Sequence, residues 1–168
     1  MNIVLRKWIP TDASRLCELA NNENIARNMR DAFPSPYTQE DALAFIHKTQ
    51  TDPHFKHVRA IDYENRPVGS IGIFQDMDIY RFNYEVGYWL REAYWGQGIM
   101  HAALQQQVAY AFSETEAHRL YAGVFEHNKG SARILEKNGF RLVGLAQQKV
   151  FKEGAFLNEC LYELIKVV

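Results

Sequence analysis

Two glycines stand in a short segment between a strand-like and a helix-like stretch of the sequence. The segment reads Trp95-Gly96-Gln97-Gly98-Ile99-Met100. Glycine lets a backbone turn tightly and lets a ligand approach closely. The first N–H groups of the helix that follows have no partner within the helix, and the helix dipole places partial positive charge there. Such a turn can bind an anion such as phosphate, although a glycine pair before a helix is more often ordinary turn chemistry.

Two familiar phosphate motifs do not fit this turn. The dinucleotide fingerprint needs a third glycine where this chain has His101, and it normally belongs to the first strand–helix unit of a domain. The P-loop needs the tripeptide Gly-Lys-Ser/Thr, which the chain lacks. By itself, therefore, the turn predicts an anion site without indicating which anion it binds.

A second polar segment follows the turn, with Asn128-x-x-Ser131 placed ahead of Glu136-Lys137-Asn138-Gly139-Phe140. In this order and at this spacing, the two segments resemble the GNAT superfamily of N-acetyltransferases. More narrowly, they resemble the branch named for ribosomal-protein N-terminal acetyltransferases, the RimJ/RimL type. Neither segment is specific alone, whereas the two together are. The resemblance covers nearly the whole chain, with further matches at Leu5-Arg6, Pro36–Thr38, Tyr84–Leu90 and Gly154.

The resemblance implies a cofactor and a reaction. Acetyl-coenzyme A would bind with its pyrophosphate on the glycine turn, an amine would attack the thioester directly, and coenzyme A would leave as product. The positions that the resemblance assigns to cofactor binding are Tyr88, Trp89, Leu90, Trp95, Gly96, Gln97, Gly98, Ile99, Met100, His101, Asn128 and Arg133.

The sequence departs from the superfamily's pattern at three positions. The phosphate loop usually begins with Arg or Gln and ends with Gly or Ala, whereas this chain has Trp95 and Met100 there. Because the loop acts mainly through backbone N–H groups, we expect binding to survive both changes. Many members also carry a tyrosine on the last helix as general acid, where this chain has Leu135.

The implied reaction needs a base for the amine, a donor for the oxyanion and a donor for the departing thiolate. For the base we choose Glu85, acting directly or through water, because it lies on the strand that leads into the turn. For the thiolate we choose Ser131, as a hydrogen-bond donor or a water relay. The backbone N–H near Leu90 is the predicted oxyanion donor.

Each of these residues also has a purely structural interpretation. Glu85 could be a solvated or ion-paired strand residue. Ser131 and Asn128 are both residue types that cap a helix, and Arg133 is of a type usually solvated on a helix surface. The aromatic residues Phe33 and Tyr37 are core candidates that we also place in the acceptor groove.

Neither a metal site nor a nucleophilic triad is expected. The pair His54-x-x-His57 has no nearby cysteine or carboxylate cluster to complete a metal site. Ser131, His127 and Asp78 do not stand in a nucleophile-elbow context. We therefore predict no metal and no covalent enzyme intermediate.

The elements that position these residues alternate between strand and helix patterns, which predicts an α/β (α+β) fold. We expect a mixed, mostly antiparallel twisted sheet of about six to seven strands with helices on both faces, and a cofactor cleft where two central strands part. Thr11 is the expected cap of the first helix, and Gly139 the expected stop of the last. The predicted strands are 3–5, 57–61, 68–74, 83–90, 119–125, 141–145 and 156–166, and the predicted helices begin near 11, 38, 98 and 130.

The composition fits one globular domain spanning residues 1–168. The chain has 168 residues, 47% of them apolar and 23% charged, with a formal net charge of −1. This balance does not favour a nucleic-acid or membrane partner. Cys17 and Cys160 are too few for a disulfide framework. With no signal peptide or spanning segment recognised, the expected location is cytoplasmic, as a monomer or homodimer.

The function predicted from these features is acetylation of a primary amine, and the branch implies a protein or peptide N-terminus as acceptor. A small amine such as an amino acid, an antibiotic or a polyamine is the alternative acceptor. The polyamine is disfavoured by Leu135 and by the lack of a dense acidic patch. A non-catalytic coenzyme A-binding module is the alternative from another class, since it would need neither Glu85 nor Ser131.

Overall fold

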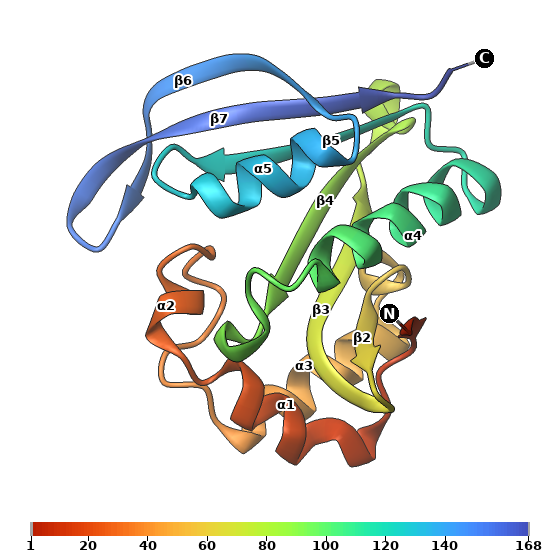
Figure 1. Cartoon of the computed structure of the whole chain (residues 1–168), viewed down its shortest axis with the longest axis vertical. Coiled ribbons are helices and arrows are strands. Elements are labelled where there is room, and N and C mark those ends of the chain that lie inside the picture. The colour runs from red at the N-terminus through yellow and green to blue at the C-terminus, as the bar shows by residue number, and fades with distance from the viewer. Residues whose placement is uncertain (1, 168) are drawn as a thin grey trace.

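The computed structural model describes residues 2–167, in which seven strands form one sheet (Figure 1). The strand order is β1-β2-β3-β4-β5-β7-β6. All neighbours are antiparallel except β4 and β5, which are parallel. The predicted mixed, mostly antiparallel sheet is confirmed. The strands are β1 (Ile3–Arg6), β2 (Arg59–Tyr63), β3 (Arg66–Gln75), β4 (Asn83–Leu90), β5 (Arg119–Phe125), β6 (Arg141–Lys152) and β7 (Ala155–Ile165).

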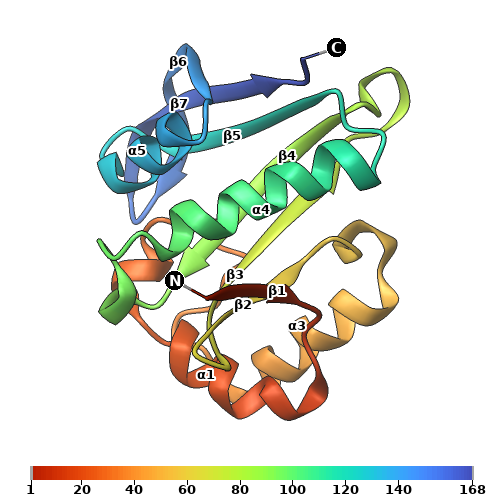
Figure 2. The same cartoon turned by 45° about the vertical axis from the view of Figure 1, so that its right-hand side comes forward.

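Helices cover both faces of the sheet, as Figure 2 shows for α1 and α3 on one side and α4 on the other. The α1–α3 side buries a core that contains Trp8 and Trp89. The α4–α5 side buries a second core that extends from β1 to β7. The helices are α1 (Ala13–Ala20), α2 (Glu23–Ala26), α3 (Gln39–Thr51), α4 (Ile99–Glu114) and α5 (Lys129–Lys137).

The helix start expected near residue 38 and the stop expected at Gly139 both form. At the start of α3, Thr38 and Asp41 form a capping box in which each side chain accepts a hydrogen bond from the other's backbone N–H. After α5, Gly139 takes the left-handed conformation at φ 83°. The expected cap at Thr11 is wrong: a 3₁₀ turn (Pro10–Asp12) precedes α1, and the Asp12 carboxylate accepts the bond from Ile9 N instead, at 3.0 Å.

The edge strand β6 is longer than the sequence pattern predicted, since it runs to Lys152 rather than to Leu145. Most of its residues are exposed, so it lacks the alternation of apolar and polar residues by which a strand is recognised. A register shift between Ala146 and Val150 interrupts its pairing with β7. Within this shift, Gln148 has φ 50° and its backbone N donates to Asn158 Oδ1 at 2.9 Å.

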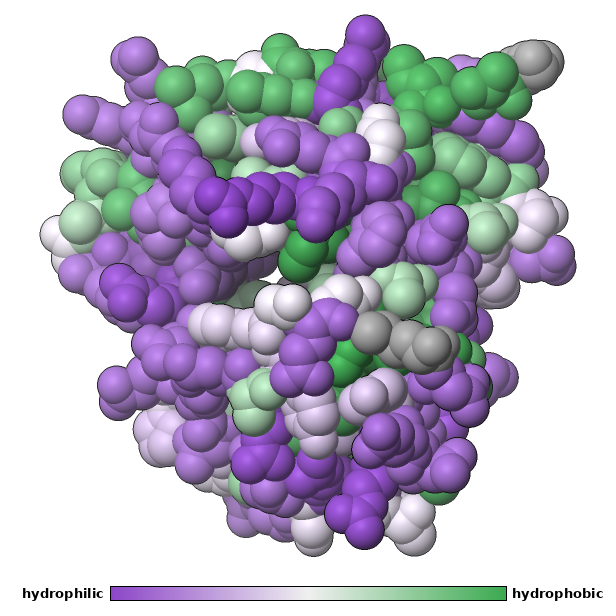
Figure 3. Space-filling view, viewed as in Figure 1, coloured by the Kyte–Doolittle hydropathy of each residue, from purple (hydrophilic) through white to green (hydrophobic). Residues whose placement is uncertain are grey.

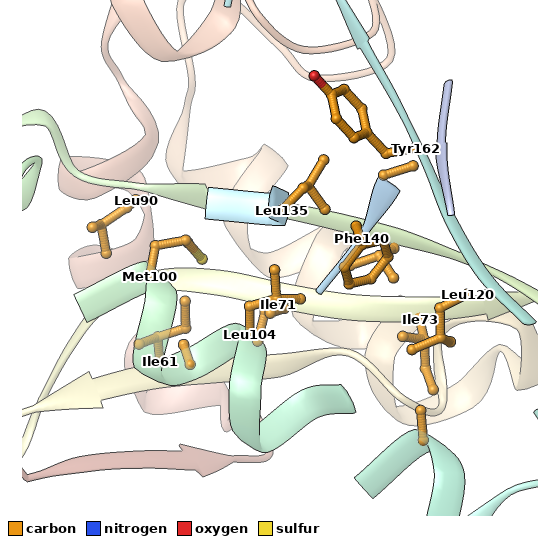
Figure 4. Close-up of a cluster of buried hydrophobic side chains, with 14 of the residues drawn as sticks. Ile61, Ile71, Ile73, Leu90, Met100, Leu104, Leu120, Leu135, Phe140 and Tyr162 are labelled. Carbon is orange, nitrogen blue, oxygen red and sulfur yellow. The ribbon is translucent and has the colours of Figure 1, made fainter. Parts of the chain in front are cut away.

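The core on the α4 side fixes the helix that follows the glycine turn. Met100 and Leu104 of α4 lie close to Ile71 of β3 in the cluster drawn in Figure 4. Leu135 of α5 belongs to the same cluster and is 0% exposed. The glycine turn is therefore fixed in position by the helix that follows it, since that helix is anchored in the core. Among residues 2–167, no helix is both long enough and apolar enough to cross a membrane.

Candidate active site

The sheet opens between its two parallel strands. Pairing of β4 with β5 covers only Asn83–Glu85 against Arg119–Tyr121. Beyond these residues the two strands diverge, as Figure 1 shows. The predicted parting of two central strands is therefore present, and it begins next to Glu85. That acetyl-CoA binds there stays a prediction.

The backbone of β4 presents free groups to this opening. Asp76 N donates to Asn83 O at 3.0 Å, and Arg91 N donates to Val68 O at 2.9 Å. Because bonded residues alternate along an antiparallel strand, the odd-numbered residues of β4 are those that bond to β3. The N–H and C=O groups of its even-numbered residues face β5, which pairs only with the first of these residues, Tyr84. The residues left facing the opening are Val86, Tyr88 and Leu90.

The opposite wall is built in the same way. Glu126 N donates to Asn158 O at 3.0 Å, and Lys166 N donates to His118 O at 2.8 Å. The even-numbered residues of β5 therefore bond to β7, and the backbone groups of Gly123 and Phe125 face the opening. An extended ligand with amide groups, such as the pantetheine arm of acetyl-CoA, can pair with such walls as an added strand would.

The glycine turn lies at the wide end of the opening. Gly96 and Gly98 both have positive φ, at 74° and 80°, and no side chain caps the N-terminus of α4. The side chains of Ile99 and Met100 are buried, so this turn offers a ligand its backbone N–H groups. Trp95 Nε1 donates to Leu90 O at 2.7 Å and ties the turn to the end of β4. Figure 3 shows the surface hollowed between the part that carries α5 and the part below it.

Glu85 faces the side of the sheet that carries α1 to α3, and it is ion-paired with Arg30. Its side chain is 25% exposed and that of Arg30 is 77% exposed. Such an exposed partner contributes little and can move away. The cross-strand neighbour Tyr121 donates to Asp76 Oδ1 at 2.9 Å. Burial, the bond to Asp76 and the negative charge of Glu85 raise the pKa of Tyr121, so its hydroxyl stays protonated.

Ser131 lies on the opposite side of the opening and forms a hydroxyl pair with Tyr88, with 2.9 Å between the two oxygens. Burial raises the pKa of Tyr88, which keeps the phenol neutral. Asn128 Oδ1 accepts from Ser131 N at 3.2 Å, so Asn128 acts as the cap of α5. Leu135 points into the core, and the hydroxyls on this side come from Tyr88 and Ser131.

Three other predicted cofactor residues direct their side chains to protein neighbours. Gln97 Nε2 donates to Ala93 O at 2.9 Å within the turn. Asn138 Nδ2 lies 3.0 Å from His101 Nδ1 and joins α5 to α4. The buried Trp89 packs against the α1–α3 side of the sheet.

Arg133 is exposed on α5. It lines a cavity of about 250 Å³ together with Cys160 and Tyr162, between α5 and β7. The contact of Arg133 with a cofactor phosphate stays a prediction.

A larger cavity, of about 410 Å³, lies between the segment 23–35 and the tip of the β6–β7 hairpin. Phe33 lines it, whereas Tyr37 is buried beneath, with its ring centroid 5.2 Å from that of Phe33. That this cavity receives the acceptor stays a prediction. The sequence pattern did not point to Lys152, which crosses the cavity to Asp31 at 2.7 Å. The lining residues are Glu23, Ala26, Asp31, Phe33, Ser35, Lys152 and Glu153.

The histidines considered for metal or triad chemistry have other partners. His57 is buried and its Nδ1 lies 2.9 Å from the Tyr110 hydroxyl, while His54 packs against Phe55. His127 Nε2 lies 2.9 Å from Asn28 Oδ1. Residues 2–167 contain no group of three or more His, Cys, Asp or Glu side chains arranged to hold a metal ion.

Comparison with known proteins identifies the family. The family model for an acetyltransferase (GNAT) domain matches residues 2–141. The probable N-acetyltransferase YjcK of Bacillus subtilis is 39% identical over 103 residues, which cover 61% of this chain and 56% of YjcK. The chain therefore spans little more than half the length of that relative. The putative ribosomal N-acetyltransferase YdaF of the same organism is 26% identical over 173 residues, covering 98% of this chain and 92% of YdaF.

The solved structures agree on the fold. RimL, a ribosomal L7/L12 alpha-N-protein acetyltransferase solved in complex with coenzyme A, aligns with a TM-score of 0.86 at 20% identity. The alignment covers 98% of this chain and 94% of RimL. This likeness shows the fold, and the family match leads to one assignment. The chain belongs to the GNAT acetyltransferase family and is an acyltransferase whose cofactor is acetyl-CoA.

Proposed function

We propose that this enzyme acetylates the free N-terminal amine of a protein or peptide. The observation that carries the proposal is the placement of two sets of reactive side chains on opposite sides of one opening. Glu85 lies on the side that carries the 410 Å³ cavity lined by Phe33, and the Ser131–Tyr88 pair lies on the side of α5. An amine can therefore enter from one side while the thiol leaves toward the other.

Glu85 is the proposed base. Bound acetyl-CoA supplies a thioester whose acyl carbon is open to attack by a neutral amine. Glu85 takes the proton that the amine must lose, directly or through one water, once Arg30 has moved aside. The backbone N–H of Tyr88, which faces the opening two residues before Leu90 and lies nearer to Glu85 and Ser131, donates to the acyl oxygen as negative charge develops there.

The Ser131 hydroxyl is the proposed donor to the departing sulfur. Tyr88 holds that hydroxyl from β4, and the cap formed by Asn128 holds its backbone from α5. A serine hydroxyl is a poor acid, so it stabilises the thiolate by a hydrogen bond rather than by full proton transfer.

An N-terminal amine suits this arrangement better than a lysine side chain. A free α-amine titrates near ~8 and a lysine near ~10.4, so a single carboxylate base at neutral pH finds more of the former already deprotonated. The names of YdaF and RimL, which refer to ribosomal proteins, support the same acceptor class. Small amines are the alternative that the experiment must separate.

Thiol release from acetyl-CoA tests the proposal with two matched peptides. One has a free N-terminus and no lysine, and the other has a blocked N-terminus and one lysine. We expect turnover with the first, little with the second, and less with small amines than with the first. Turnover confined to small amines would overturn the acceptor assignment.

Glu85→Gln tests the base. We expect kcat to fall by roughly 100-fold or more. Glu163→Gln is the matched control, since Glu163 stands on the same face of the sheet two strands away, paired with Arg119 and Arg141. An unchanged rate in Glu85→Gln would remove Glu85 from the mechanism.

A further inference from the structure

A second carboxylate, from β7, lies over the strand that borders the opening. Glu159 pairs with Phe125 of β5, and its side chain leans back over Gly123. A Cβ built on Gly123 would lie only 2.7 Å from Glu159 Cδ and 2.8 Å from Glu159 Oε2. Any side chain at position 123 would therefore displace this carboxylate. The carboxylate therefore lies on the same face of the sheet as Glu85, above the strand whose backbone borders the opening.

A lysine from the neighbouring strand covers this carboxylate. Lys149 of β6 is ion-paired with Glu159. The Glu159 side chain is 15% exposed and that of Lys149 is 58% exposed. Lys149 stands inside the register shift of β6, next to Gln148 with its positive φ. Bulges of this kind occur beside active sites, where they redirect a side chain.

The chemistry of the Glu159–Lys149 ion pair indicates which other group Glu159 can bind. A carboxylate that is mostly removed from water needs a cationic partner, because an unpaired buried charge is costly. The present partner, Lys149 Nζ, is a primary ammonium group on an alkyl chain. A protonated acceptor amine carries the same group, and Lys149 is exposed enough to leave.

We propose that Glu159 binds the ammonium group of the incoming acceptor, which takes the place of Lys149. The inference rests on the proposed function and adds a second acidic residue to it. Glu85 stands opposite Tyr121, and Gly123 follows two residues later on the same face of β5, about 6.6 Å along the strand. Glu159 holds the charged amine, and Glu85 receives its proton.

The two glutamates therefore have separable effects on kinetics. Loss of Glu159 weakens acceptor binding, whereas loss of Glu85 slows the chemical step. With the free N-terminal peptide, Glu159→Gln should raise the acceptor KM by roughly 10- to 100-fold while kcat and the KM for acetyl-CoA stay near those of the wild type. The melting temperature is measured alongside, so that a folding defect is recognised.

Lys149→Met gives the opposite expectation. It removes the competing ammonium, so the acceptor KM should fall by about two- to fivefold. In the double variant with Glu159→Gln, the Lys149 change should have no effect on the acceptor KM. No carboxylate then remains for which the lysine and the acceptor amine could compete. Arg141→Met is the matched control: it also removes an exposed cation from a mostly buried glutamate of β7, Glu163, and should leave the acceptor KM unchanged.

A binding measurement separates this inference from the proposed function. Titration calorimetry of the free N-terminal peptide into enzyme saturated with coenzyme A should show weaker binding to Glu159→Gln and tighter binding to Lys149→Met. If wild-type enzyme acetylates the peptide but these variants bind it equally, the role of Glu159 is wrong and the proposed function stands. If the peptide is neither bound nor acetylated, both fail.

Discussion

The hydroxyls of Tyr88 on β4 and Ser131 on α5 form a hydrogen bond that links the two elements. This pair gives the chain a donor near the opening where the family pattern would place a tyrosine at position 135. Leu135 is wholly buried, so that position serves the core instead. Because burial raises the pKa of Tyr88, its proton is present throughout the pH range in which an amine acetyltransferase can be assayed. We therefore expect Tyr88 to act by orienting Ser131 rather than by giving up its proton.

Removing the Ser131 hydroxyl should lower turnover more than removing the Tyr88 hydroxyl. We expect Ser131→Ala to lower kcat about tenfold, which corresponds to one lost hydrogen bond to a charged sulfur, with little change in the KM for acetyl-CoA. Tyr88→Phe should lower kcat less, because Ser131 keeps its place through Asn128. Steady-state thiol release measures both. Full activity in Ser131→Ala would show that the thiolate needs no donor from α5.

The sequence placed Glu85 on the strand that leads into the turn, and the family resemblance singled out Ser131. The structure places both residues beside the opening, while their catalytic roles stay predictions and their partners could not be predicted. The pairs Glu85–Arg30 and Ser131–Tyr88 join residues 55 and 43 positions apart. Such contacts depend on how α5 and the segment after α2 lie on the sheet, and no local pattern encodes that.

At the scale of elements, the turn needs a left-handed backbone conformation and open space for a ligand, and glycine satisfies both requirements. Gly96 has a positive φ, and a Cβ added to it would meet nothing within 4 Å. The space above Gly96 is therefore open, as a phosphate site needs. Periodicity and motif spacing predicted β4, the turn and α4, whereas the second half of β6 was missed because an edge strand exposed on both faces has no apolar alternation.

Substitution of Gly96 separates backbone strain from ligand binding. Gly96→Ala should cost about 1–2 kcal/mol of stability, because alanine resists the left-handed conformation. Its methyl group should also weaken coenzyme A binding by at least tenfold, by intruding where the pyrophosphate approaches. Melting temperature and titration calorimetry measure the two effects.

Gly154, at the tip of the β6–β7 hairpin, provides the matched control. It too has a positive φ, 80°, and open space around an added Cβ. Gly154→Ala should lose similar stability and bind coenzyme A normally. Equal loss of coenzyme A affinity in both variants would mean that the turn at Gly96 does not hold the cofactor.

At the scale of the whole molecule, the sheet has two halves joined at the short pairing of β4 with β5. Beyond that pairing the halves separate, so the opening in which we propose that acetyl-CoA binds interrupts the hydrogen-bonded sheet. The core on the α4 side compensates, since it contains residues from β3 and β4 as well as from β5, α5 and β7. Exposed apolar side chains remain on β6 and β7, including Leu142, Leu145, Phe151 and Phe156. The expected monomer or homodimer stays a prediction.

This shared core should make the two halves unfold together despite the opening. The three tryptophans, Trp8, Trp89 and Trp95, all precede α4 and report on the first half, whereas far-UV circular dichroism reports on both. We expect one urea midpoint from the two signals. Leu120→Ala, at the fully buried residue of β5 opposite Tyr84, should lower stability by about 2–5 kcal/mol and shift both signals equally. If fluorescence and circular dichroism change at different urea concentrations, the opening divides the chain into independent folding units. The shared core would then not be what holds Glu85 and Ser131 in position relative to each other.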